Sequence, residues 1–284
     1  MKKIFVAFIL SAFMAPVFCQ EESAASSNPV TSSTFTTSTL IDNQSVTAID
    51  KGSIQLQIYH RFSKISSIKD LYGIYGSANT RIGLNYGISN RIMIGAGTTK
   101  DYKLQDLNWK VVLLQQTEDN KMPVSLAYYG NLVIDARDKD AFGPVDYRFI
   151  HRLSYFTQII VARKFSEKIS LQVAPEMAYI NAVPQYTADS TYKNLNFGFS
   201  VGGRANLFGN HSLIVEYDQL LTNQPKMETK PNLSVGWEIG TPTHCFQVFV
   251  ANYNQIISQR NLVFNKNDIA NGDFLFGFNI TVRF

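Results

Sequence analysis

Two serines lie close to histidines, which is the pairing of a nucleophile and a general base that hydrolases use. Ser212 directly follows His211, and Ser154 comes three residues after His151. Such a pair must share one face, whereas residues an odd number apart on a β-strand point to opposite faces. The spacing therefore argues against catalysis. We expect no enzyme activity, and a lipid-modifying enzyme is the least favoured of three hypotheses for this chain.

One acidic segment could resemble a metal site. Its carboxylates are interspersed with basic side chains, which balance most of the charge: Asp135, Asp138, Asp140 and Asp146 with Arg137, Lys139 and Arg148. A calcium loop needs a tighter oxygen pattern with a turn glycine. The sequence predicts a solvated loop, with no metal and no cofactor.

The charged residues within the strand-like runs are more informative. Alternation places a set of them on the polar face of each run: Arg61, Arg81, Arg152, Arg204, Arg283, Glu176, Glu216, Asp218 and Glu238. Charges that cannot face lipid must pair or line water. We expect either a ladder of ion pairs that makes the interior rigid or the lining of a pore. The mixture of signs argues against strong selectivity for anions or cations.

The runs that position these residues are long enough to cross a bilayer when tilted. Twelve of them are expected, at about 53–61, 78–88, 91–99, 106–116, 122–134, 148–164, 169–181, 194–207, 211–221, 232–240, 244–253 and 272–284. Short connections alternate with mostly longer ones. This is typical of a closed up-and-down antiparallel transmembrane β-barrel with periplasmic turns and outer loops.

The last run ends the chain on an apolar stripe. Phe278, Ile280, Val282 and Phe284 share one face, and polar residues take the other. A soluble β-sandwich would also alternate, but the closing strand of an outer-membrane barrel faces lipid and ends in this way. We expect these four residues to act as a barrel-assembly signal.

The first part of the chain divides into three. Residues 1–19 combine two lysines with a short apolar run, so they predict a secretory signal peptide cleaved before Gln20. Lipidation of Cys19 is the alternative, which bulky Phe18 disfavours. Residues 20–50, rich in Ser and Thr, are expected to form a flexible periplasmic lead-in, and residues 51–284 the barrel. Cys245, the other cysteine, is expected to be a packing residue.

Several stretches resemble a family of outer-membrane β-barrel proteins found mainly in Bacteroidota, the DUF5777-like family. They are N-Q-S-V at 43–46, K-G-S-I-Q-L-Q-I-Y-H-R-F at 51–62, T-R-I-G-L-N-Y-G-I-S-N-R-I-M-I-G at 80–95, H-R-L-S-Y at 151–155, A-R-K-F-S at 162–166 and the ending F-G-F-N-I-T-V-R-F. The resemblance implies a barrel in the cell outer membrane of a Gram-negative bacterium. It implies no activity, because the family has no assigned functional residues.

Two functions fit these expectations. The first is a narrow, porin-like channel or transporter for a small solute. The second is a non-conducting structural or docking barrel, whose loops 62–77 and 254–271 bind a protein partner; the apolar residues of 254–271 could instead fold inward. The expected partners are the lipid bilayer and the barrel-assembly machinery. Removing Lys2 and Lys3 lowers the formal charge from +4 to +2, which gives no basis for nucleic-acid binding.

Overall fold

The structure is a computed structural model that describes residues 29–65, 67, 69, 71–143, 146–183, 185–187, 190–224 and 229–284. The predicted signal peptide, residues 1–19, lies outside the described residues. Within the described part of the chain, no helix is long and apolar enough to cross a membrane.

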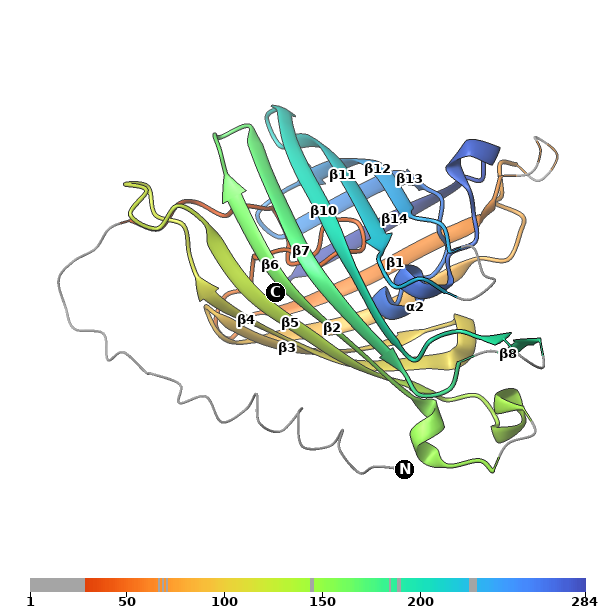
Figure 1. Ribbon diagram of the computed structural model, residues 1–284. Helices are drawn as coiled ribbons and strands as arrows, with labels where there is room; N and C mark the ends of the chain where they lie inside the picture. Colours follow the sequence, from red (N-terminus) through yellow and green to blue (C-terminus); the bar gives the residue numbers. More distant parts are fainter. Residues whose placement is uncertain are drawn as a thin grey trace.

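Twelve antiparallel strands close into a barrel in the order β1-β14-β13-β12-β11-β10-β7-β6-β5-β4-β3-β2, so the predicted fold class is confirmed (Figure 1). The strands are β1 (Ile54–Lys64), β2 (Asn79–Ser89), β3 (Ile92–Thr99), β4 (Leu104–Leu114), β5 (Ser125–Asp135), β6 (Leu153–Lys164), β7 (Ile169–Ile180), β10 (Leu195–Phe208), β11 (His211–Leu220), β12 (Asn232–Gly240), β13 (His244–Ala251) and β14 (Leu275–Arg283). The pairing of β1 with β14, with Ile58 opposite Ile280, closes the sheet.

The two ends of the barrel differ. The short connections β2–β3, β4–β5, β6–β7, β10–β11 and β12–β13 lie at one end, called here the turn end. The other end, the loop end, carries the remaining elements: η2 (Asp101–Lys103), η3 (Lys139–Phe142), η4 (Phe149–Arg152), the small hairpin β8 (Gln185–Thr187) and β9 (Ser190–Thr191), α2 (Ser258–Phe264) and η5 (Ile269–Asn271).

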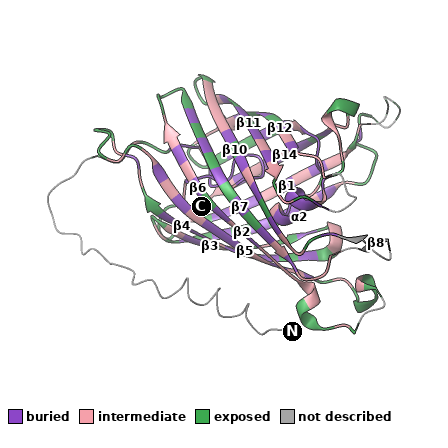
Figure 2. Cartoon of the chain, in the orientation of Figure 1, coloured by how far each residue is buried: buried purple, intermediate pink, exposed green. Residues whose placement is uncertain are grey.

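Side chains alternate between the two faces of the barrel wall, as β7 shows most clearly (Figure 2). Ile169, Leu171 and Val173 are exposed on the outer face, whereas Gln172 and Glu176 are buried inside. An outer face of aliphatic side chains is unfavourable in water and favourable against lipid chains. The pleat of the strand thus sends the polar and charged residues into the lumen.

The lumen is filled by the segment that precedes β1, which is called here the plug hairpin (residues 34–49). The prediction of a flexible lead-in outside the barrel does not hold for these residues, which are mostly buried within it (Figure 1). The apolar side chains of the plug hairpin explain the difference: Phe35, Leu40, Ile41, Val46 and Ile49 are all buried. Each large apolar side chain buried in this way contributes about 1.5–3 kcal/mol.

The inner face of β5, β6 and β7 is apolar where it meets the plug hairpin. Phe156 and Ile160 point inward on β6 and belong to the same buried cluster as Leu40 and Val46. The general expectation of a polar lumen therefore fails on this side of the barrel. A wall of this kind would be poorly solvated in an empty pore, so it indicates that the wall and the plug hairpin pack together as one core.

Candidate functional site

Both ends of the plug hairpin leave through the turn end. On the entering side, Thr31 N–H donates to Gln116 O at 3.0 Å, beyond the end of β4. On the returning side, Gly52 has a φ of +80°, which glycine adopts without steric cost, and donates to Gly87 O at 2.8 Å. The tip is closed by a hydrogen bond of 2.8 Å from Leu40 N–H to Asn43 O. The segment thus enters the lumen, turns and returns.

One side of the tip binds the carboxylates of β11. Glu216 accepts backbone N–H groups from Ile41, Asp42 and Asn43 at 2.9, 2.9 and 3.0 Å. Asn43 Nδ2 also donates to Asp218 Oδ1 at 2.5 Å. Three successive backbone donors around one carboxylate form an anion-binding concavity. The plug therefore satisfies Glu216 without bringing a positive side chain to it.

The other side of the tip binds a buried arginine. Arg61 has 0% of its side chain exposed and makes an ion pair of 2.7 Å with Asp42. Arg61 also donates to Asn279 Oδ1 at 2.9 Å, and its guanidinium carbon lies 4.3 Å from the centre of the Phe249 ring. Because a buried charge without a partner is costly, Asp42 and Arg61 depend on each other.

Basic side chains also bind the stems of the plug hairpin. Lys110 Nζ, fully buried on β4, donates to the carbonyls of Ser38 at 2.6 Å and Thr47 at 3.1 Å. Arg283 donates to the carbonyl of Thr36 at 2.6 Å. These cations thus anchor both stems to the wall by charge-assisted hydrogen bonds to backbone carbonyls.

Other charged groups pair within the wall itself. Arg81 makes two hydrogen bonds to Asp106, at 2.9 and 2.7 Å, and Arg204 pairs with Glu238 at 2.8 Å. Glu176 accepts from Gln158 at 2.7 Å. The two arginine–carboxylate pairs add rigidity to the wall and compensate each other's charge, whereas the partner of Glu176 is a neutral amide.

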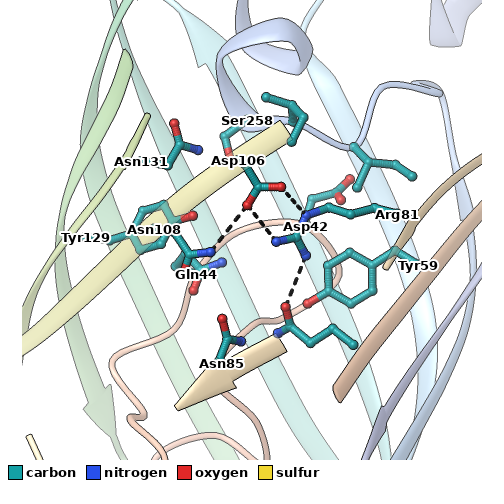
Figure 3. Close-up of a pocket in the computed structure, with 13 residues that line it drawn as sticks. Asp42, Gln44, Tyr59, Arg81, Asn85, Asp106, Asn108, Tyr129, Asn131 and Ser258 are labelled. Carbon is teal, nitrogen blue, oxygen red and sulfur yellow. Dashed lines mark hydrogen bonds and ion pairs between the residues drawn. The ribbon is translucent and has the colours of Figure 1, made fainter. Parts of the chain in front are cut away.

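A polar cavity remains beside the plug tip (Figure 3). It leaves about 370 Å³ free of protein atoms and is lined by amides, phenols and the Arg81–Asp106 pair. The part that a water molecule can enter holds about one or two waters. Asn85 Oδ1 faces no donor among the described residues, so water is the natural partner for it. Water-sized gaps therefore separate the tip from the wall on this side.

The loop end is covered by α2, called here the lid helix (Ser258–Phe264). Asn261, Leu262 and Val263 of the lid helix are buried, and the ideal position of a Cβ on Gly198 lies 2.7 Å from Leu262 Cδ1. Asn261 Nδ2 donates to Asp42 Oδ2 at 3.3 Å. The apolar residues of 254–271 thus fold inward, and the lid helix contacts the plug tip from the loop end.

Cations of the loops surround one tyrosine at the edge of the lid. The guanidinium carbons of Arg260 and Arg137 lie 3.6 and 4.6 Å from the centre of the Tyr102 ring. Burial lowers the pKa of Arg260, whereas a hydrogen bond to Asp135 raises the pKa of Arg137. Tyr102 has a φ of +60°, a left-handed conformation that is energetically unfavourable for residues other than glycine.

Most of the predicted lumen residues lie inside the barrel and meet the plug hairpin or one another. Arg152 does not, because β6 begins one residue later, at Leu153. Arg152 ends η4 instead, and its guanidinium donates to the carbonyl of Asp135 at 2.7 Å, to the Arg137 carbonyl and to the Tyr147 hydroxyl. Its assignment to the lumen was wrong: it fixes a loop at the loop end.

The predicted assembly residues lie on the outward-facing side of the closing strand, β14, and just beyond its end. Phe278, Ile280 and Val282 alternate with buried residues along β14, and Phe284 is 74% exposed beyond its end. His60 stacks on Phe278, with ring centres 4.9 Å apart. The stripe is available to lipid or to another protein.

The residues that sequence reasoning missed are those of the plug hairpin, above all Asp42 and Asn43. The available signal was the inward parity of Phe156 and Ile160, because large apolar residues on a polar face need a partner inside the barrel. The many Ser and Thr residues of 34–49 concealed that partner.

The adjacent His211 and Ser212 lie on opposite faces of β11 and contact different neighbours. His211 stacks on Phe208 with ring centres 4.8 Å apart and accepts from Trp237 Nε1 at 3.1 Å, whereas Ser212 is buried on the opposite face. Among the described residues, no group of His, Cys, Asp or Glu side chains is placed to hold a metal ion. Cys245 is a buried free thiol.

Residues 35–284 match the family described as "Membrane bound beta barrel domain (DUF5777)", a match that includes nearly all of the plug hairpin. The NanC porin is 8% identical, with a TM-score of 0.51 over 81% of this chain and 98% of that chain. An outer membrane channel from Pseudomonas putida F1 is 11% identical, with a TM-score of 0.51 over 84% and 98%. At these identities the likeness shows the fold alone. No curated protein matches the sequence. The chain belongs to the DUF5777 family of membrane-bound β-barrel proteins.

Proposed function

We propose that this protein is an outer-membrane channel or transporter for a small solute, closed at rest by the plug hairpin. The observation that carries the proposal is the position of the plug hairpin. It fills the lumen but is not a strand of the closed barrel sheet. The plug can therefore leave while every wall strand keeps both neighbours. The two similar structures, a porin and an outer membrane channel, support transport as the general role.

The proposed location is the outer membrane of a Gram-negative bacterium, with the turn end in the periplasm. Barrels of this type have short periplasmic turns and long outer loops. The outward stripe from Phe278 to Phe284 suits recognition by the barrel-assembly machinery. In this orientation the plug enters from the periplasm and the lid helix faces outward.

A disulfide lock provides a direct test. A Cβ placed on Gly240 lies 3.6 Å from Thr36 Cβ, within the range of disulfide geometry. We would introduce Thr36→Cys and Gly240→Cys in a background with Cys19→Ala and Cys245→Ala, then measure conductance in planar bilayers. The oxidised protein should remain closed, and reduction should restore openings. The two single-cysteine variants serve as controls and should respond to neither treatment.

The lock is informative only for a folded barrel, so heat-modifiable gel migration should be confirmed first. A second variant forces the plug out: Gly202→Leu places a side chain where Leu40 sits, because a Cβ on Gly202 would already lie 2.5 Å from Leu40 Cδ1. Gly203→Leu, on the outer face of the same strand, is the matched control. A folded Gly202→Leu barrel that stays silent would contradict the channel proposal.

One observation favours a docking barrel as the second candidate. Leu71, Tyr72, Ile74 and Tyr75 are exposed in the loop between β1 and β2, Tyr75 by 76%. Loop 254–271 does not contribute, because most of its large apolar residues are buried. Replacing Ile74 and Tyr75 by serine should abolish capture of a partner if docking is the role, and should leave conductance unchanged.

A further inference from the structure

The plug tip bridges two oppositely charged parts of the wall through a single residue. The backbone N–H of Asp42 donates to Glu216 Oε2 at 2.9 Å, and its carboxylate pairs with Arg61 at 2.7 Å. Asp42 therefore presents a donor on one side and a carboxylate on the other. A nitrogen donor and a carboxylate held a short distance apart are the polar groups of a small zwitterion, here with the two-carbon spacing of a β-amino acid.

The wall groups that the tip satisfies would lack partners without it. Glu216 would lose the three N–H groups that it accepts from Ile41, Asp42 and Asn43. Arg61 would keep its bonds to Asn279 and the His60 carbonyl, and its Nε already has no partner among the described residues. An empty lumen would thus expose an unpaired cation on β1 and an unpaired carboxylate on β11.

Neighbouring groups sharpen this polarity. Asp218 lies on the same inner face of β11 as Glu216, and Glu176 lies on the inner face of β7, so the acidic side carries several carboxylates. Lys110 on β4 would lose the plug carbonyls to which it donates. The Arg81–Asp106 and Arg204–Glu238 pairs remain paired in the wall and select nothing.

Resting on the channel function, we propose that Arg61 and the Glu216–Asp218 pair form a binding site for a small zwitterion, an amino acid or short peptide, and that Asp42 occupies this site in the closed state. An ammonium group supplies three donors, the number that Glu216 accepts from the tip. The guanidinium of Arg61 matches a carboxylate in its geometry.

Ions of one charge fit this site less well. A simple anion would pair with Arg61 and leave Glu216 buried without a partner, and a simple cation would do the reverse. Either arrangement leaves a desolvated charge uncompensated, which is strongly unfavourable. A neutral polyol can hydrogen-bond to both groups but supplies neither of the opposite charges. The zwitterion is therefore the solute class that replaces the tip group for group.

The experiment uses diglycine as the zwitterion and acetate, methylammonium and glycerol as the comparisons. In the Gly202→Leu barrel, diglycine should block the potassium chloride current at about tenfold lower concentration than any of the other three, as one charge-assisted contact is worth roughly that factor. Arg61→Gln and Glu216→Gln should each remove most of that preference. Arg163→Gln and Glu167→Gln, at the turn end outside the lumen, are the charge-matched controls.

A second measurement does not depend on conduction. In the Thr36→Cys/Gly240→Cys chain, diglycine should slow the formation of the cross-link severalfold, because the solute and the tip compete for Arg61 and Glu216. Current without preference among the four solutes, together with an unchanged cross-linking rate, would overturn the zwitterion site and leave the channel standing. A silent barrel with slowed cross-linking would support the site and overturn the channel.

Discussion

The guanidinium carbon of Arg260 lies 3.6 Å from the centre of the Tyr102 ring, and this contact joins the lid helix to the loop between β3 and β4. The lid helix has only seven residues, too few to be stable alone, so its position depends on such contacts. A second cation, Arg137, approaches the same ring. Tyr102 is thus the shared point of three loops at the loop end.

Replacing Tyr102 with leucine should loosen the lid. The loss of two cation–π contacts is expected to destabilise the closed lid by about 1–2 kcal/mol, which should raise the rate of protease cleavage within 252–274 severalfold in intact vesicles. The control is Tyr75→Leu, at a largely exposed position. Equal cleavage rates for the two variants would show that Tyr102 does not hold the lid.

Removing the carboxylate of Asp42 should destabilise the seated plug. Asp42→Ala leaves Arg61 buried without its counterion, a loss of up to about 3–5 kcal/mol for the closed state. We expect a lower yield of the Thr36–Gly240 cross-link and more frequent openings. Asp50→Ala removes an exposed carboxylate from the residue directly after the plug hairpin and should change neither quantity.

A double-mutant cycle isolates the pair. The effects of Asp42→Ala and Arg61→Gln on the cross-linking yield should be far from additive, because either change removes the same interaction. Additive effects would mean that the two residues stabilise the plug independently.

The chain that leads from the plug hairpin to β1 passes very close to Gly87. A Cβ on Gly87 would lie 2.1 Å from the carbonyl oxygen of Asp50, so the backbone itself would have to move. We expect Gly87→Ala to displace the returning stem and to lower the midpoint of thermal unfolding. Gly203→Ala, which meets only the end of the Leu171 side chain, should leave that midpoint within error.

The lipid-facing side of β7 should show a dependence on depth. Val173→Arg lies near the middle of the strand and should reduce the free energy of unfolding in lipid vesicles by about 2–4 kcal/mol, whereas Ile169→Arg, at the turn end, should cost about 0–1 kcal/mol. Urea titration followed by tryptophan fluorescence measures both values. Equal costs would contradict the proposed bilayer position.

The wall of the barrel could be predicted from the sequence because its determinants are local. Alternation along each strand and the lengths of the connections locate twelve strands, and the predicted and observed bounds differ by only a few residues in most of them. Arg152 shows the limit of the method: parity assigns a face only where the strand exists, and a 3-10 helix occupies that position instead.

The plug could not be predicted in this way because its determinants are not local. Asp42 and Glu216 are 174 residues apart in sequence, and nothing near either one signals the other. For loop 254–271 the sequence left open whether its apolar residues bind a partner or fold inward. Contacts such as that between Leu262 and Gly198 decide the question in favour of inward folding.

The hairpin course of the plug has a mechanical consequence. Because both of its stems pass through the turn end, it can slide out and back as a loop, with no chain end to thread and no strand to separate. Repeated opening would then exchange protein contacts for water or solute contacts and leave the hydrogen bonds of the wall intact. The motion is topologically free, and its rate is governed by the contacts that the tip, the stems and the apolar side chains of the plug hairpin make with the wall.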